Sequence, residues 1–250
     1  VERAVLDRGV RGGGGPGPER PRPPGAVRGV HPKVGGRSRR IKLKIEPGFD
    51  VDAVRAVREH IGPDVPLQVD ANTAYTVADA DHLARLDEFD LLLIEQPLPE
   101  DDIAGHVVLA ERVRPPICLD ESILSAAGAD DAIDRGACSV VNIKAGRVGG
   151  YLEAVRVHDA CRDRAVPVWC GGMVETGLGR AANVALAALP GFTWPGDTSG
   201  PDRFFTTDLT GPLVLRDGGL GVPTAPGLGV APIPELLERF TTHTEWLRPE

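Results

Sequence analysis

Five charged residues stand at the ends of five short apolar runs, at intervals of about 25 residues. They are Lys44 in RIKLKI, Asp70 in LQVDAN, Glu95 in LLLIEQ, Asp120 in ICLDES and Lys144 in VVNIK. Carboxylates are the oxygen ligands that hard divalent cations such as Mg²⁺ prefer, and lysines can act as general bases and acids. If the five side chains meet, they could remove a proton next to a substrate carboxylate while a metal neutralises the charge that develops.

The three carboxylates follow three consecutive apolar runs. A single Asp or Glu after a strand more often caps a helix or faces solvent. Three at even spacing favour a shared site that leaves coordination positions for water and substrate. We therefore predict that Asp70, Glu95 and Asp120 bind Mg²⁺, with Mn²⁺ or another divalent ion as a substitute.

Lysines at the ends of two apolar runs could act as acid and base. In IKLKI, a strand would place Lys42 and Lys44 on the same face, because side chains alternate with a period of two. In a closed barrel that face is the interior, whereas an edge strand would leave both lysines solvated. Positive charge from Lys42 and from a metal disfavours the charged form of Lys44, which can then act as a base. Lys144 would lie across the barrel, suited to return a proton to the opposite face of the substrate.

Apolar runs and helical patterns alternate regularly from residue 40 onward, which predicts repeated βα units. The predicted strands cover 40–45, 67–72, 91–97, 117–122, 139–144 and 166–171, with a further short run at 192–194. The predicted helices cover 51–60, 77–88, 103–113, 126–135, 151–164 and 179–189. A chain of 250 residues fits one barrel or two small domains. We favour a barrel over a doubly wound sheet, because the candidate residues end nearly every strand instead of clustering at one switch point.

The two ends of the chain have a different composition. The first 40 residues contain ten Gly, six Pro and ten Lys or Arg against three acids. We expect residues 1–39 to be a disordered low-complexity segment, and a nucleic-acid-binding arm is less favoured because the segment has no aromatic side chain to stack on a base. The Gly- and Pro-rich tail, 211–250, is predicted to be mostly loop with a short helix near 233–241.

Bulk properties exclude several classes of protein. A net charge of −8 argues against binding to nucleic acid or to an anionic membrane. No apolar run approaches the roughly 18 residues of a membrane span, and the first residues lack the apolar core of a secretory signal. The four cysteines form no CxxC pair, which predicts buried, reduced thiols in a cytoplasmic protein. The expected partner is a small-molecule carboxylate, and a homo-oligomer is left open.

Six motifs occur in a characteristic order: VDANTAY, LLLIEQPL, CLDESI, NIKAGRVGGYLEA, CGGMVETGLGRAANVA and GDTSGPDRFF. With the KxK motif Lys42-Leu43-Lys44, this series resembles the muconate-lactonizing subgroup of the enolase superfamily. Within that subgroup it is most similar to the o-succinylbenzoate synthase / N-acylamino acid racemase family, over residues from about 40 to 205. The resemblance implies a TIM-like (β/α)7β barrel over 40–210, which the tail 211–250 would complete.

The resemblance also implies roles for individual residues. Lys44 and Lys144 would be the catalytic acid/base pair, supported by Lys42. The other implied roles are Mg²⁺ ligation by Asp70, Glu95 and Asp120, a supporting role for Glu121, and substrate contacts from Asn72, Gly171, Gly172, Met173 and Glu175.

Two reactions are implied for such a site, and both begin with abstraction of an α-proton to form a metal-stabilised enediolate. Dehydration of a cyclohexadiene carboxylate to o-succinylbenzoate, a step of menaquinone biosynthesis, would use Lys44 as base and then as acid. Racemisation of an N-acylamino acid would use Lys44 and Lys144 in turn. Dipeptide epimerase and muconate cycloisomerase are the alternatives within the superfamily, although GGMVETG and SGPDRFF weaken both. A catalytically silent, truncated barrel is the alternative outside it.

One feature departs from the family pattern. Its members carry an N-terminal α+β capping domain, and the sequence before residue 40 does not resemble one. Text rich in Arg, Gly and Pro is typical of GC-rich DNA translated out of frame. We therefore hypothesise a frameshifted or truncated product whose true frame resumes near 37–40. Translation of the upstream coding DNA in three frames tests this, and the absence of a capping domain from all three would contradict it.

Overall fold

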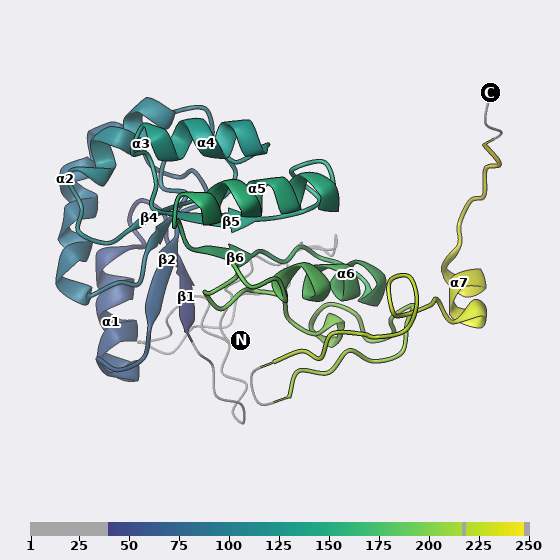
Figure 1. Cartoon of the computed structure of the whole chain (residues 1–250). Helices are drawn as coiled ribbons and strands as arrows, with labels where there is room; N and C mark the ends of the chain where they lie inside the picture. Colours follow the sequence, from purple (N-terminus) through teal and green to yellow (C-terminus); the bar gives the residue numbers. More distant parts are fainter. Residues whose placement is uncertain (1–39, 217–218, 248–250) are drawn as a thin grey trace.

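The computed structural model describes residues 40–216 and 219–247, so the predictions made for 1–39 lie outside the described residues. Six strands form one sheet in the order β1-β2-β3-β4-β5-β6, and every neighbouring pair is parallel (Figure 1). The strands are β1 (Ile41–Lys44), β2 (Leu67–Asp70), β3 (Ile94–Glu95), β4 (Ile117–Leu119), β5 (Val140–Ile143) and β6 (Val168–Cys170). A doubly wound sheet would reverse its strand order, so the sequential order confirms a barrel-like domain with a parallel half-barrel sheet.

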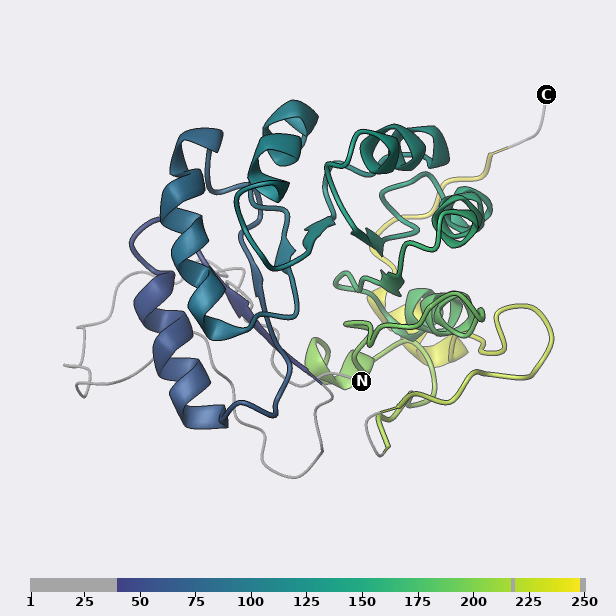
Figure 2. The ribbon, with the colours of Figure 1, turned by 60° about the vertical axis from the view of Figure 1, so that its left-hand side comes forward.

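Helices connect successive strands and lie along the outer face of the sheet (Figure 2). They begin and end within a few residues of their predicted positions. The regular helices are α1 (Val51–Ile61), α3 (Ile103–Ala110), α4 (Ala126–Asp134), α5 (Tyr151–Asp163), α6 (Gly177–Ala187) and α7 (Pro234–Phe240).

The segment predicted as one α-helix over 77–88 differs from that prediction. It consists of the 3₁₀ helix η1 (Val77–Asp79), a single α-helical turn α2 (Ala80–Leu83) and the 3₁₀ helix η2 (Ala84–Phe89). The buried side chains of this segment recur at positions 80, 83, 86 and 89. A spacing of three residues matches the three residues per turn of a 3₁₀ helix, so the tighter helix is the one that buries all four.

The two faces of the sheet have different chemistry. On the outer face, side chains such as Leu43, Val69 and Ile94 belong to the large apolar core that also includes residues of the helices. On the inner face, only a small apolar cluster forms, from Leu93, Cys118, Val140 and Trp169. Since side chains alternate along each strand, the polar residues that lie two positions away from these share the inner face.

The sheet edge beyond β6 continues as an irregular segment. The backbone amide of Trp194 donates to the carbonyl of Val168 at 3.4 Å, and that of Asp197 donates to Cys170 at 3.2 Å. Residues 194–197 therefore run beside β6 without forming a regular strand. The short run predicted at 192–194 is not among the strands of the described residues.

The C-terminal part is mostly loop, as predicted. Within the described part of the tail, α7 buries no residue, and the chain extends away from the sheet (Figure 1). All four cysteines are buried and free, which confirms the predicted thiols. In the described ranges, no helix has both the length and the apolar character needed to cross a membrane.

Candidate active site

The five charged residues that recur along the sequence all lie at the same end of the sheet. Lys44, Asp70 and Glu95 are the last residues of β1, β2 and β3, while Asp120 and Lys144 directly follow β4 and β5. The strand register pairs Lys44 with Asp70 and Asp70 with Glu95. All three carboxylates are buried. The parallel fold therefore gathers side chains that lie up to 100 residues apart in the sequence.

Lys42 lies at the centre of a buried ionic cluster. Its Nζ is 3.1 Å from Asp70 Oδ2, 3.1 Å from Glu95 Oε2 and 3.0 Å from Asp197 Oδ2. Burial alone would lower the pKa of Lys42, but the carboxylates of Glu95, Asp197 and Asp70 raise it well above its usual range. Lys42 is therefore held as an ammonium.

The two predicted acid/base lysines each contact one of the buried aspartates. Lys44 Nζ lies 2.6 Å from Asp70 Oδ2 and also donates to Asn72 Oδ1. Lys144 Nζ lies 2.6 Å from Asp120 Oδ2. Burial lowers the pKa of Lys144, yet the nearby carboxylates, that of Asp120 above all, raise it overall. Two amines thus occupy separate strand ends, and each has its own carboxylate partner.

Two amide side chains hold Glu95. Asn142 Nδ2 donates to Glu95 Oε1 at 2.9 Å, and Gln68 Nε2 donates to Oε2 at 3.1 Å. Burial and the charges of Asp70 and Asp120 raise the pKa of Glu95 to about 8, although Lys42 opposes that shift. Asp70 and Asp120 are therefore close enough to disfavour ionisation of Glu95, and a divalent cation would offset this negative charge.

The donor set fits Mg²⁺ in kind and number, since it consists of three buried carboxylates. In the described ranges, no three His, Cys, Asp or Glu side chains are spaced as ligands around one ion. Instead, the ammonium groups of Lys42, Lys44 and Lys144 lie against the carboxylates. Binding of a metal would require these ammonium groups to move aside.

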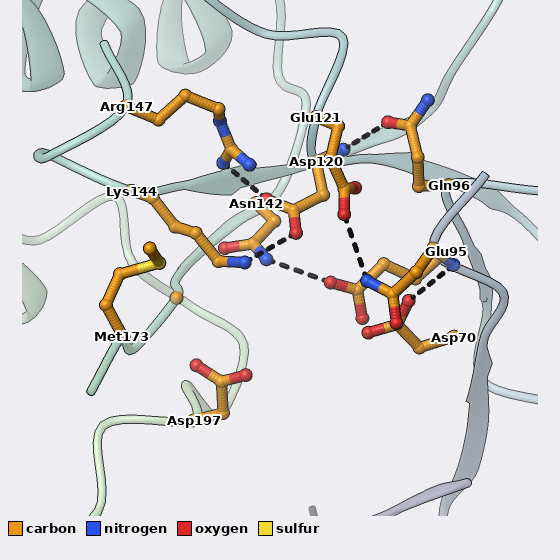
Figure 3. A network of polar contacts seen from close by, with 12 residues as sticks. Asp70, Glu95, Gln96, Asp120, Glu121, Asn142, Lys144, Arg147, Met173 and Asp197 are labelled. Carbon is orange, nitrogen blue, oxygen red and sulfur yellow. Dashed lines mark hydrogen bonds and ion pairs between the residues drawn. The ribbon is translucent and has the colours of Figure 1, made fainter. Parts of the chain in front are cut away.

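Asp120 has two further partners that the sequence analysis missed. Arg147 forms an ion pair with Asp120 Oδ1. Gln96 accepts a hydrogen bond from the Asp120 backbone amide at 2.9 Å and one from the Ser122 amide at 3.1 Å. Figure 3 shows Arg147 and Lys144 reaching Asp120 from the same side. These contacts fix both the backbone and the carboxylate of Asp120.

Two further predicted residues, Asn72 after β2 and Glu121 after β4, join this network. Asn72 Nδ2 donates to Glu121 Oε1 at 2.9 Å, so Asn72 links Lys44 to Glu121. Burial and the charge of Asp120 raise the pKa of Glu121, whereas the hydrogen bond from Asn72 opposes the shift. Asn72 and Glu121 therefore lie at the rim of the buried cluster.

The predicted substrate residues after β6 do not all face the cluster. A Cβ on Gly171 would come closest to Asn142 Oδ1 and would lie only 2.7 Å from Lys144 Cγ, so the glycine leaves room for both side chains. The Gly172 amide donates to Asp197, and the Met173 side chain is half exposed. The Glu175 carboxylate is instead bound by Asn183 and Arg180 of α6.

The sequence spacing indicates three further residues of the cluster, Gln68, Asn142 and Asp197. The interval of about 25 residues that joins Lys44 to Lys144 continues through Gly171 to Asp197. Gln68 and Asn142 each lie two positions before a predicted site residue, and therefore on the same face of their strands. Arg147 and Gln96 lie in loops, where no periodicity indicates their direction.

Comparisons with known proteins agree with this arrangement. Residues 28–236 match the family model described as enolase C-terminal domain-like. The chain is 70% identical over 208 residues to an N-succinylamino acid racemase from Amycolatopsis sp. The matched region covers 83% of this chain and 56% of that protein. It is 53% identical over 204 residues to an o-succinylbenzoate synthase from Geobacillus stearothermophilus, and this match covers 81% of this chain and 54% of that protein. The chain thus spans about half the length of the curated relatives it matches.

Solved structures extend the comparison to three dimensions. An enolase superfamily member from Listeria innocua matches with a TM-score of 0.80 at 42% identity, covering 83% of this chain and 56% of that one. A dipeptide epimerase from Cytophaga hutchinsonii, solved with Mg and the dipeptide D-Ala-L-Val, matches with a TM-score of 0.74 at 26% identity, covering 80% and 56%.

Proposed function

Because the chain belongs to the enolase C-terminal domain-like family, we propose that it is a Mg²⁺-dependent enzyme that removes a proton from the carbon next to a carboxylate. Its reaction would be o-succinylbenzoate synthesis, N-acylamino acid racemisation, or both. The observation that carries the proposal is the pair of lysines at separate strand ends, Lys44 against Asp70 and Lys144 against Asp120, each at 2.6 Å. The names of the two curated relatives favour these reactions over dipeptide epimerisation and muconate cycloisomerisation.

The chain's own residues would divide the work as follows. Lys44 takes the α-proton from one face of the substrate. In racemisation, Lys144 delivers a proton to the other face, whereas in dehydration Lys44 returns the proton to the leaving hydroxyl and Lys144 stabilises the anion by its charge. Asp70, Glu95 and Asp120 would hold Mg²⁺, which when bound neutralises negative charge on the substrate carboxylate.

The remaining predicted residues would shape the substrate site. Asn72 and Glu121, which are hydrogen-bonded to each other, would border it together, and Gly171 and Gly172 would leave room beside Lys144. Met173 would contact the substrate from the same loop, and Glu175 would hold that loop against α6. We infer further that residues 40–210 form a (β/α)7β barrel in which 194–197 follow the seventh strand position, and that a homo-oligomer in the cytoplasm is the working form.

Proton exchange tests the proposal. N-succinylamino acids would be incubated with the purified chain in D₂O, with Mg²⁺ or with EDTA, and the α-proton followed by ¹H NMR. The o-succinylbenzoate precursor would be assayed in parallel by product formation. We expect turnover of at least one substrate that depends on Mg²⁺. No exchange and no dehydration by the folded protein would favour the catalytically silent barrel.

A further inference from the structure

Lys42 contacts three carboxylates, and only two of them have a role in the proposed reaction. Asp70 and Glu95 are proposed Mg²⁺ ligands, whereas Asp197 belongs to the segment beyond β6. The three N–O distances lie between 3.0 and 3.1 Å, so the ammonium is shared almost equally. The third carboxylate therefore requires its own explanation.

Hydrogen bonds hold both the backbone and the side chain of Asp197. Its backbone amide donates to the Cys170 carbonyl at 3.2 Å, and its Oδ1 accepts from the Gly172 amide. Its Oδ2 is left for Lys42, and the residue is 9% exposed. Asp197 thereby connects the loop after β6 to the inner face of β1, and it presents one carboxylate oxygen to the buried ammonium.

A divalent cation and the Lys42 ammonium would compete for the same two carboxylates. Lys42 is itself buried, and a buried charge without a partner is strongly destabilising. If Asp70 and Glu95 turn to a metal, the ammonium needs another anion within reach. Asp197 is placed to supply it.

We propose that Asp197 is a positioning residue, a counter-ion that holds the Lys42 ammonium when Asp70 and Glu95 bind Mg²⁺. The inference rests on the proposed function, because it assumes that these two carboxylates are metal ligands. It assigns Asp197 no contact with substrate. Its role is to hold the Lys42 ammonium on its own carboxylate, so that Asp70 and Glu95 remain free for the metal.

The Asp197→Asn variant removes the charge and retains a side-chain oxygen for the Gly172 amide. Without that charge, the Lys42 ammonium would have only Asp70 and Glu95 as counter-ions and would compete with the metal for them. We expect Mn²⁺, used as the probe and followed by electron paramagnetic resonance, to bind about tenfold more weakly, an effect typical of directly coupled charges. Asp202→Asn is the matched control, since Asp202 is exposed and lies five residues further along the same segment. It should leave Mn²⁺ binding unchanged.

A double-mutant cycle separates the proposed route from simple attraction of the metal by a nearby negative charge. The Lys42→Met variant removes the competing ammonium and should bind Mn²⁺ more tightly than the unaltered chain. In that background, Asp197→Asn should lose most of its effect, because no ammonium remains to be held. An equal loss in both backgrounds would overturn the inference in favour of direct attraction.

The outcomes distinguish this inference from the proposed function. If the unaltered chain binds Mn²⁺ but Asp197→Asn binds it equally well, the inference fails and the proposed function stands. If Asp197→Asn does not fold, as judged by circular dichroism, Lys42→Met still decides, because unchanged or weaker Mn²⁺ binding contradicts the competition. If the unaltered chain binds no Mn²⁺, both proposals fail.

Discussion

The two sides of the strand-end cluster hold their lysines in different ways. On the β4–β5 side, the Lys144 side chain is 14% exposed, lies against Gly171 and shares Asp120 with Arg147. On the β1–β2 side, the Lys44 side chain is 29% exposed and contacts Asp70 and Asn72. Lys144 is thus fixed by its direct surroundings, whereas Lys44 has more room to move towards a substrate.

The loops around Lys44 are nevertheless held together by contacts outside the cluster. Asp50, which precedes α1, accepts hydrogen bonds from the Val51 amide at 2.6 Å and from Tyr75 Oη at 3.0 Å, and His82 Nε2 lies 2.8 Å away. These contacts tie the loop after β1 to the loop after β2. The β4–β5 side therefore fixes the lysine itself, whereas the β1–β2 side fixes the loops and leaves the lysine adjustable.

The largest expected effect comes from removing the adjustable lysine. Lys44→Ala should reduce both racemisation and dehydration by roughly a thousandfold or more, since both reactions begin with the same proton abstraction. Steady-state kinetics on both substrates, with Mn²⁺ binding as a check on the metal site, would measure this. Retention of either activity would assign the base elsewhere.

Lys144→Ala should separate the two reactions. Racemisation needs a proton on the second face and should fall by roughly a thousandfold, whereas dehydration should fall less because Lys144 only stabilises the anion there. Deuterium exchange should persist for the enantiomer whose α-proton faces Lys44 and be lost for the other. Racemase activity that survives the substitution would remove the two-lysine mechanism.

Gly171→Ala should disturb Lys144 while leaving its charge in place. The new Cβ would come closest to Asn142 Oδ1 and would lie 2.7 Å from Lys144 Cγ and Cε, so both side chains must shift. A displacement of about 1 Å can cost up to roughly a hundredfold in rate, so we expect racemisation to fall about ten- to a hundredfold. Gly146→Ala is the matched control in the loop after β5, because a Cβ there meets nothing within 4 Å. Equal effects of the two substitutions would contradict the packing argument.

The sequence predicted most of the framework, because a buried parallel strand leaves a clear mark. Five of the apolar runs end at a charged residue, and each of the six strands lies within its predicted run. The regular helix predicted over 77–88 does not match the spacing of the buried apolar residues there. Their interval of three, at positions 80, 83, 86 and 89, was a usable sign of a 3₁₀ helix.

The candidate site was less completely predictable, for two physical reasons. Gln68 and Asn142 are uncharged, so nothing marked them as costly to bury, although alternation placed them on the inner face. Arg147 and Gln96 act from loops, whose direction depends on tertiary contacts. Asp197 continues the interval of about 25 residues, but it lies in an irregular segment whose place beside β6 depends on two backbone hydrogen bonds.

The smallest expected effect is on the free energy of unfolding, and it concerns Asp50, which holds the loops around Lys44 together. Burial raises the pKa of Asp50, but the hydrogen bonds from His82, Val51 and Tyr75 lower it overall. Because the pKa is lower in the folded state than in the unfolded state, the stabilisation is complete above the unfolded pKa of about 4. It is lost as the pH falls through the folded value.

Asp50→Asn should therefore lower the free energy of unfolding by about 1 to 2 kcal/mol at pH 7, the loss expected when a charged acceptor is removed from buried hydrogen bonds. The difference from the unaltered chain should stay constant down to about pH 5 and shrink towards pH 3. Urea unfolding at pH 7, 5 and 3 measures it. Asp52→Asn is the control, because Asp52 lies exposed in the first turn of the same helix and shares its dipole without the buried contacts. If both variants lose the same stability at every pH, the loops around Lys44 are not anchored by Asp50, and the contrast between the two sides of the cluster reduces to the exposure of the lysines alone.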